Sequence, residues 1–364
     1  MTTEIYTDTY TKTKKEIPNL LFGAEMKLPE FQKLDPLKTL FILPVGSQEV
    51  HGRHLTNNSD MISAELMAES SGKLFAKKHE DWNVILFPLL NIGSDQLPLP
   101  GSIEISRSVV YKTLVDYGRS LAKWGFKNLV ITNGHGGLMH NLALDDACRT
   151  CNRKFGMKMI SPGTLVFQDY IYGKKFPAME NVMGRKLSPS EKNSLTDMEH
   201  AAGWETSIML ARRPDLVAED YKKYGPTNVE ISPFFKKIGQ TIDSIGRRTP
   251  FIGKLIERGG VTMDEAFRLL KVQYNLYAGQ KKQEYSYNGD PSVASAEIGK
   301  AWDAGVSNDL SLLYESVYIK GSKNPNQVVS SFSALVILRH DFMVSLAWML
   351  VLGVLAATIL IHLK

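Results

Sequence analysis

Three short apolar runs, each followed by a segment with helical periodicity, organise the first half of the chain. The runs cover residues 39–45, 84–90 and 128–132, and the segments that follow predict helices over 62–79, 107–124 and 138–155. Strands that alternate with helices predict an α/β fold with a mostly parallel sheet. In such folds ligands bind beyond the carboxyl ends of the strands, and the unusual polar clusters of this chain fall there.

The remaining segments predict the domain organisation. Residues 1–36 are a polar lead-in without the apolar core of a secretory signal, and residues 37–320 form the main domain. Residues 170–193 are rich in Lys, Gly, Pro and Met and predict a long loop of the kind that often covers a site. Residues 221–287 turn basic and partly helical, which indicates an insertion, and residues 321–341 form a linker.

An uncharged apolar run, FMVSLAWMLVLGVLAATILI, occupies residues 342–361. Twenty residues of helix span about 30 Å, the thickness of the hydrocarbon layer. We therefore predict a single transmembrane helix of the tail-anchor type, with the main domain facing the cytoplasm. The alternative is a buried helix of a soluble protein, but such helices normally carry a polar stripe.

The charge and the cysteine content limit the classes of binding partner and indicate the redox state of the compartment. Lys and Arg number 43 against 38 Asp and Glu, and this formal charge of +5 gives no argument for nucleic-acid binding. Cys148 and Cys151 are too few for a disulfide framework and fit a reducing compartment. Their C-x-x-C spacing also occurs in redox and zinc sites, but no second pair completes a zinc site, so we interpret them as two thiols on one helix.

The first polar cluster, PVGSQEVHGRHLTNNSD, follows the first predicted strand at residues 44–60. It contains Glu49, His51, His54 and Asp60. Alternate side chains of an extended segment point the same way, so Glu49 and His51 can converge while the loop brings Asp60 back. Carboxylate and imidazole together ligate zinc, manganese or iron. An exposed polar loop would have the same composition, and the cluster alone does not decide between the two.

Two further clusters carry titratable groups. NGHGGL, residues 133–138, follows the third strand, and its glycines free backbone amides to face negative charge, while His135 is either a ligand or structural. DMEHAAGWETS, residues 197–207, places Asp197, Glu199, His200 and Glu205 within nine positions. Such groups repel each other unless a metal or a proton relay lies between them, and the alternative is a solvated acidic turn. No glycine fingerprint for a dinucleotide and no phosphate loop occurs.

Together with LPGSIEIS at residues 99–106 and GDPSVASAEIGK at 289–300, these clusters resemble the creatininase family. The resemblance covers most of residues 38–217 and returns at 289–300. It implies a three-layer αβα domain around a mostly parallel sheet, two divalent metal ions (zinc, manganese or iron) and a closed homo-oligomer.

The resemblance also implies roles for individual residues. Glu49 and His135 would hold one ion, His51 the other, and Asp60 would bridge both; Glu205 would be the fifth ligand, because Gly137 stands where creatininase itself has a Glu. In such a hydrolysis the leaving nitrogen must be protonated, and the candidate proton donor is His200 oriented by Glu199, with Asp197 a weaker candidate. The implied substrate-binding residues are Gly136, Gly137, Gln96 and Ser102.

The chain departs from the family pattern at two positions: Leu138 stands where Asn is common, and Gln96 stands where His is common. Both positions neighbour the ligands and are not ligands themselves, so the departures bear on the substrate more than on the metals. The implied activity is cleavage of a C–N bond in a small cyclic or formyl-type amide by a water that two metals activate. Two alternatives stay open: a metal-dependent hydrolase of a lactone or sugar-like ring, and an inactive membrane-tethered binding protein.

Overall fold

The computed structural model describes residues 17–196, 200–227, 237, 241 and 286–330. Within them a parallel sheet runs in the order β1-β3-β2-β5-β6, with the short β4 paired to the end of β2. Its strands are β1 Leu20–Phe22, β2 Thr39–Gly46, β3 Asn83–Leu86, β4 Leu90–Asn91, β5 Asn128–Asn133 and β6 Lys158–Ile160.

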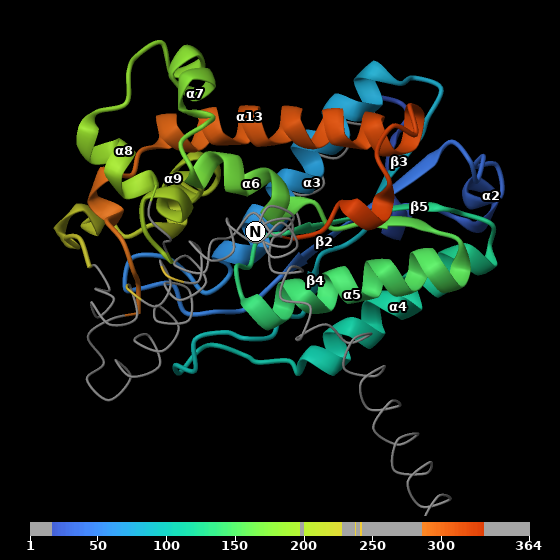
Figure 1. The fold of residues 1–364 in the computed structure, drawn as a ribbon, viewed down its shortest axis with the longest axis horizontal. Helices are drawn as coiled ribbons and strands as arrows, with labels where there is room; N and C mark the ends of the chain where they lie inside the picture. The colour runs from blue at the N-terminus through green and yellow to red at the C-terminus, as the bar shows by residue number, and fades with distance from the viewer. Residues whose placement is uncertain (1–16, 197–199, 228–236, 238–240, 242–285, 331–364) are drawn as a thin grey trace, which may run out of the picture.

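Helices cover both faces of the sheet and make three layers (Figure 1). The long helices α3 and α13 lie on one face together with α6 to α9, whereas α4 and α5 pack side by side on the other. The helices are α2 Leu28–Phe31, α3 Ser59–Lys78, α4 Arg107–Lys123, α5 Leu138–Phe155, α6 Gly163–Ile171, α7 Phe176–Met183, α8 Pro189–Leu195, α9 Gly203–Arg212 and α13 Ala296–Tyr314.

Alternation along the central strand divides the core between the two faces. Leu40 and Ile42 of β2 belong to the cluster beneath α3 and α13, and Phe41 and Leu43 belong to the cluster beneath α4 and α5. Successive side chains of a strand point to opposite faces, so a strand covered on both sides reads as a continuous apolar run. The predicted α/β class and parallel sheet are confirmed, and the helix over residues 138–155 has the predicted ends.

The second apolar run differs from the prediction. It was expected as one strand over residues 84–90, but β3 ends at Leu86 and β4 begins only at Leu90. Pro88 lies between them. Proline has no N–H to donate to the ladder, so the run is interrupted there.

The N-terminal lead-in is shorter than predicted. Residues 1–36 were expected outside the domain, but Leu20 lies in the edge strand β1, fully buried and in register with Val84. The apolar triplet of β1 is too short to show periodicity in the sequence. The main domain therefore begins before residue 37.

The predicted loop over residues 170–193 is helical in the structure, which corrects that interpretation. It contains the end of α6, all of α7 and most of α8. Pro177 and Pro189 stand in first turns, where proline is tolerated, and Gly184 ends α7 with φ of 69°. Buried Glu180 accepts hydrogen bonds from two lysines and fixes α7 against the start of α8. The Lys, Gly and Pro that suggested a loop are capping and pairing residues.

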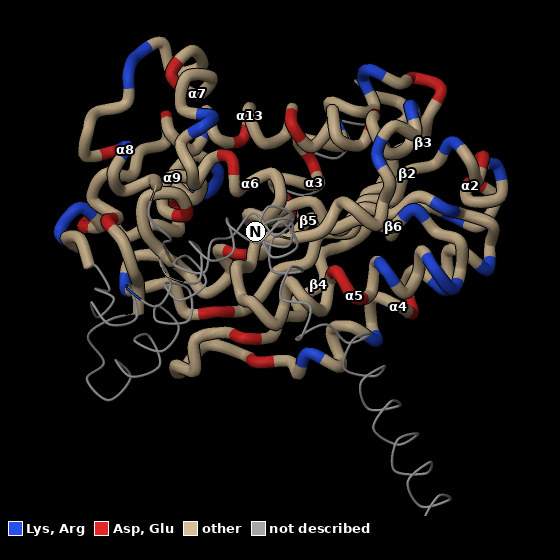
Figure 2. The backbone as a smooth tube through the Cα atoms, viewed as in Figure 1, with Lys and Arg blue, Asp and Glu red and all other residues tan. Residues whose placement is uncertain are grey.

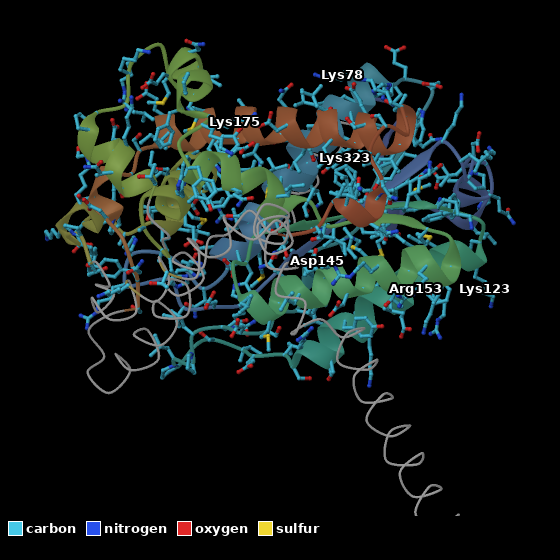
Figure 3. The ribbon with its side chains drawn as sticks, in the orientation of Figure 1. Lys78, Lys123, Asp145, Arg153, Lys175 and Lys323 are labelled. Atoms are coloured by element: carbon cyan, nitrogen blue, oxygen red, sulfur yellow. The ribbon has the colours of Figure 1, made fainter. Side chains whose placement is uncertain are left out.

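The predicted linker starts as part of the folded domain. Val328 is fully buried, and Ser330 donates its N–H and its Oγ hydrogen to the buried carboxylate of Asp145 on α5. Figure 3 labels Asp145 on that helix. The chain is thus attached to α5 up to residue 330.

Two predicted segments lie outside the described residues. Most of the insertion at 221–287 is one, and the apolar run at 342–361 is the other. In the described part of the chain, no helix combines the length and the apolarity needed to cross a membrane. Basic and acidic positions both occur on the helices that cover each face of the sheet (Figure 2), in keeping with the small net charge.

Candidate metal centre

The first two polar clusters meet because small residues end two neighbouring strands. Gly46 ends β2 and Gly134 follows β5. A Cβ atom at Gly134 would lie 2.1 Å from the backbone oxygen of Asp60, and one at Gly46 would lie 2.6 Å from Cα of Met61. The N-terminus of α3 can therefore approach the strand ends, which places Asp60 between the two loops.

One group of possible metal ligands is formed by Glu49, Asp60 and His135. Nδ1 of His135 lies 3.0 Å from Oε2 of Glu49 and 3.1 Å from Oδ2 of Asp60. All three side chains are buried. We call this group triad A.

A second group shares Asp60 and adds His51 and Glu205 from the first turn of α9. Nε2 of His51 lies 3.0 Å from Oδ1 of Asp60 and 3.5 Å from Oε2 of Glu205. Each Asp60 oxygen therefore faces a different histidine. We call this group triad B.

The tautomers of His51 and His135 direct one nitrogen lone pair into each triad. Nδ1 of His51 lies 2.9 Å from the carbonyl oxygen of Glu49, and Nε2 of His135 lies 3.0 Å from that of Ser94. A carbonyl oxygen only accepts hydrogen bonds, so these nitrogens carry the hydrogens. In the neutral rings the other nitrogens have lone pairs that face carboxylate oxygens. Metal-bound histidines are oriented in this way.

The negative charge of the buried carboxylates favours the binding of cations in this pocket. Burial by itself lowers the pKa of His51, yet the charges of Asp60 and Glu205 raise it to about 10. Burial likewise opposes the ionisation of Asp60, but His51 and His135 hold the pKa of its carboxyl below the usual range. The carboxylates thus draw extra protons onto the imidazoles, and bound divalent ions would take the place of those protons.

Two buried atoms at the centre have no hydrogen-bond partner among the described residues: Nε2 of His51 and Oδ2 of Asp60. Buried polar atoms are nearly always paired, so each exception needs an explanation. Mixed nitrogen and oxygen donors with unused lone pairs fit zinc, manganese or iron. The residues present therefore fit two divalent ions, one at each triad.

His200 lies beside this centre. Its ring centroid is 4.5 Å from that of His51, and with Glu49 and His51 it forms a third possible ligand group among the described residues. Nε2 of His200 lies 2.9 Å from the carbonyl oxygen of Val50. The other two acidic candidates of this cluster, Asp197 and Glu199, lie outside the described residues.

The predicted substrate-binding residues occupy the loops around the centre. Gly136 is exposed, and a Cβ atom there would meet nothing within 4 Å. Gln96 is buried and donates a hydrogen bond to Oγ of Ser47, while Oγ of Ser102 accepts one from the N–H of Val50. A Cβ atom at Gly137 would lie 2.5 Å from Nε2 of His135, so no side chain fits at that position without a shift.

His54, part of the first cluster, is in neither triad. Its Nε2 lies 3.1 Å from Oγ1 of Thr206, and its ring stacks on that of Tyr224. Burial lowers the pKa of His54 to about 4, so the ring is neutral.

The sequence reasoning missed a buried polar network behind His135. Asn133 Oδ1 accepts hydrogen bonds from the His135 N–H and from Nε2 of His140, and the Asn141 amide donates to the carbonyl oxygens of His135 and Gly137. These groups fix the glycine-rich turn. The sequence contained a signal for this network: His140 and Asn141 are polar residues in the first turn of a helix that is otherwise rich in apolar and buried positions.

Comparison with known proteins connects this site to a family. The family model for creatininase (creatinine amidohydrolase) matches residues 24–313. The mycofactocin precursor peptide peptidase of Mycolicibacterium smegmatis is 32% identical over 127 residues, or 34% of this chain and 51% of that relative. Creatinine amidohydrolase of Pseudomonas putida is 30% identical over 210 residues, or 55% of this chain and 75% of that relative.

A crystal structure of creatinine amidohydrolase (creatininase) shares the fold, with a TM-score of 0.53 and 19% identity over 82% of this chain and 98% of that chain. The chain thus matches about half the length of the first relative and three quarters of the second. The family model, by contrast, covers most of the chain, from the connection between β1 and α2 to the end of α13. The resemblance seen in the motifs is confirmed, and the chain belongs to the creatininase family.

Proposed function

We propose that this protein is a metal-dependent amidohydrolase that cleaves a C–N bond in a small cyclic or formyl-type amide. The observation that carries the proposal is the pair of triads that share Asp60. Each triad combines carboxylates with a histidine whose second nitrogen is fixed by a backbone carbonyl. Solved creatininases described as a manganese form and as a Zn-Zn type support two divalent ions.

The bound ions would polarise the scissile carbonyl and lower the pKa of a water molecule. His200 is placed to move a proton. Its Nε2 donates to the carbonyl oxygen of Val50, which leaves Nδ1 as the atom that can exchange a proton with the leaving nitrogen. The open backbone at Gly136, beside His135, leaves room for the developing oxyanion.

A peptide C–N bond is the second candidate for the substrate. The relative from Mycolicibacterium smegmatis is a precursor peptide peptidase, and its matched segment is slightly more similar to this chain than is creatinine amidohydrolase of Pseudomonas putida. Both candidates require the same centre and differ in what the surrounding loops admit.

Untargeted metabolite and peptide profiling tests the proposal. The full-length protein, prepared in detergent with and without a chelator, is incubated with a cell extract. We expect one compound to gain the mass of water only in the chelator-free sample. A new amine and a new carboxylate, in one ring-opened product or in two fragments whose masses add up to substrate plus water, identify a cleaved C–N bond, whereas a hydroxy acid formed from a lactone supports the alternative hydrolase. A chain that binds no divalent metal contradicts the proposal.

We also propose that residues 342–361 tether the domain to a membrane as a single-pass helix, with the catalytic domain in the cytoplasm. The support is the uncharged run itself, long enough to span the hydrocarbon layer.

A further inference from the structure

The loop of residues 94–97, between β4 and α4, contacts triad A from outside. The carbonyl oxygen of Ser94 accepts a hydrogen bond from Nε2 of His135 at 3.0 Å. The N–H of Leu97 donates to Oε1 of Glu49 at 2.6 Å. Two of the three members of triad A are thus oriented by backbone atoms of the same four residues.

Asp95 connects this loop to α5. Its Oδ2 accepts a hydrogen bond from the N–H of Met139 at 3.1 Å, in the first turn of the helix that follows the His135 turn. A carboxylate in this position satisfies a free N–H and interacts favourably with the helix dipole. The loop that orients His135 is therefore anchored to the helix that His135 precedes.

The backbone of Asp95 is strained. Its φ is 72°, in the left-handed region that costs energy for residues with a Cβ atom, although Asp and Asn tolerate it better than most. In the ranges that the structure describes, one other non-glycine residue has positive φ: Ala201, whose N–H donates to the Glu205 carboxylate of triad B. Strained residues persist where the surroundings enforce them, and they concentrate at functional sites.

The loop packs closely against the His135 turn. A Cβ atom at Gly137 would lie 2.9 Å from the carbonyl oxygen of Ser94 and 3.1 Å from Cβ of Asp95. A small displacement of Asp95 would therefore move the carbonyl oxygen that orients His135. His51 and Glu205 make no hydrogen bond with residues 94–97 among those that the structure describes.

From these contacts we infer that Asp95 is a positioning residue for one ion: it holds loop 94–97, through which Glu49 and His135 are aimed at the ion of triad A, and leaves the ion of triad B unaffected. Asp95 acts through the Ser94 carbonyl and the Leu97 N–H and does not touch the ion. This inference rests on the proposed dimetal centre, and it assigns loop 94–97 to the support of the triad A ion.

Metal titration of the full-length, metal-free protein tests the inference. Mn²⁺ is added to the wild type and to Asp95→Ala, Asp95→Asn and Asp35→Ala, and calorimetry gives the number of binding events and their affinities. Asp35→Ala is the matched control, because Asp35 also accepts a hydrogen bond from a backbone N–H, that of Leu37, but on the exposed surface away from the site. Thermal melts of the metal-free proteins measure any general loss of stability.

We expect Asp95→Ala to weaken one of two binding events by about 10–100-fold, the usual effect of removing a group that orients a metal ligand. The other event should stay as in the wild type. Asp95→Asn keeps an acceptor oxygen and tolerates positive φ, so it should retain both events, as should Asp35→Ala. If Asp95→Ala does not fold, Asp95→Gly replaces it, since glycine removes the hydrogen bond and relieves the strain.

The inference is overturned if the variant that folds binds both ions as the wild type does, or weakens both equally. A wild type that binds fewer than two ions instead contradicts the dimetal centre, whatever the variants do. The two failures are therefore distinguishable.

Discussion

Nε2 of His51 lies 3.0 Å from Oδ1 of Asp60, and both side chains are almost completely buried. The other oxygen of the same carboxylate lies 3.1 Å from Nδ1 of His135. Each oxygen of the Asp60 carboxylate thus faces a different imidazole. Both triads therefore depend on Asp60.

Asp60→Ala should weaken the binding of both ions, and by more than the roughly 10–100-fold typical of groups outside the metal ligands. Because each triad loses one carboxylate, the loss should not be confined to one event. Metal content after dialysis, measured by mass spectrometry, checks this result. Asp116→Ala, which removes a carboxylate of an exposed ion pair on α4, should retain both metals. Retention of two ions by Asp60→Ala would exclude a bridging role.

The stability of the metal-free protein should fall at alkaline pH. The pKa of His51 is raised to about 10, so the stabilisation from its protonated ring is fully present below the unfolded value of about 6.5 and is lost as the pH rises towards 10. Thermal melts between neutral pH and pH about 10 measure the decline. His51→Asn should show a weaker alkaline decline, and equal slopes for the two proteins would contradict the assignment.

Of the two glycines that flank His135, only Gly134 should be sensitive to substitution by alanine. A Cβ atom at Gly134 would collide with the backbone oxygen of Asp60, whereas one at Gly136 would meet nothing within 4 Å. Overpacking typically costs about 1–3 kcal/mol, so Gly134→Ala should lower the free energy of unfolding by about that amount and weaken metal binding. Denaturant unfolding measures the difference, with Gly136→Ala as the control in the same turn. Equal effects at both positions would mean that α3 does not approach β5 as described.

The edge strand β1 should contribute to stability although it precedes the predicted domain. Leu20 is fully buried, and truncating such a side chain costs about 2–5 kcal/mol, so Leu20→Ala should lower the free energy of unfolding accordingly. Leu28→Ala provides the control, because Leu28 is 70% exposed. Denaturant unfolding of both variants checks the prediction, and a Leu20→Ala protein as stable as Leu28→Ala would place β1 outside the cooperative core.

Removal of residues 342–361 should release the protein from membranes. The uncharged run is the only basis for the predicted anchor, so its deletion should transfer the chain from the membrane pellet to the supernatant after cell fractionation. Deleting residues 1–16 serves as the control and should leave the distribution unchanged. Carbonate-extractable full-length protein would contradict a spanning helix.

The sequence by itself determined the fold class and the composition of the candidate site. The apolar runs of β2 and β5 are buried on both faces, and a parallel sheet requires such runs, so local pattern predicts it. The positions of Glu49, His51, Asp60 and His135 after these strands followed from the rule that parallel strands end at one edge. Local patterns were less informative where tertiary contacts decide, as in β1 and in the helices α7 and α8.

Only the tertiary structure decided which atoms face one another. The lone pair of His135 and the support of triad A by loop 94–97 depend on hydrogen bonds between residues 41 to 48 positions apart. The sharing of Asp60 likewise brings His51 and His135 to one carboxylate. The closeness of α3 to the turn at Gly134 depends on the absence of two Cβ atoms. Periodicity records which face of an element is buried, whereas the direction of a side chain in a site is set by loops and hydrogen bonds that have no repeating pattern.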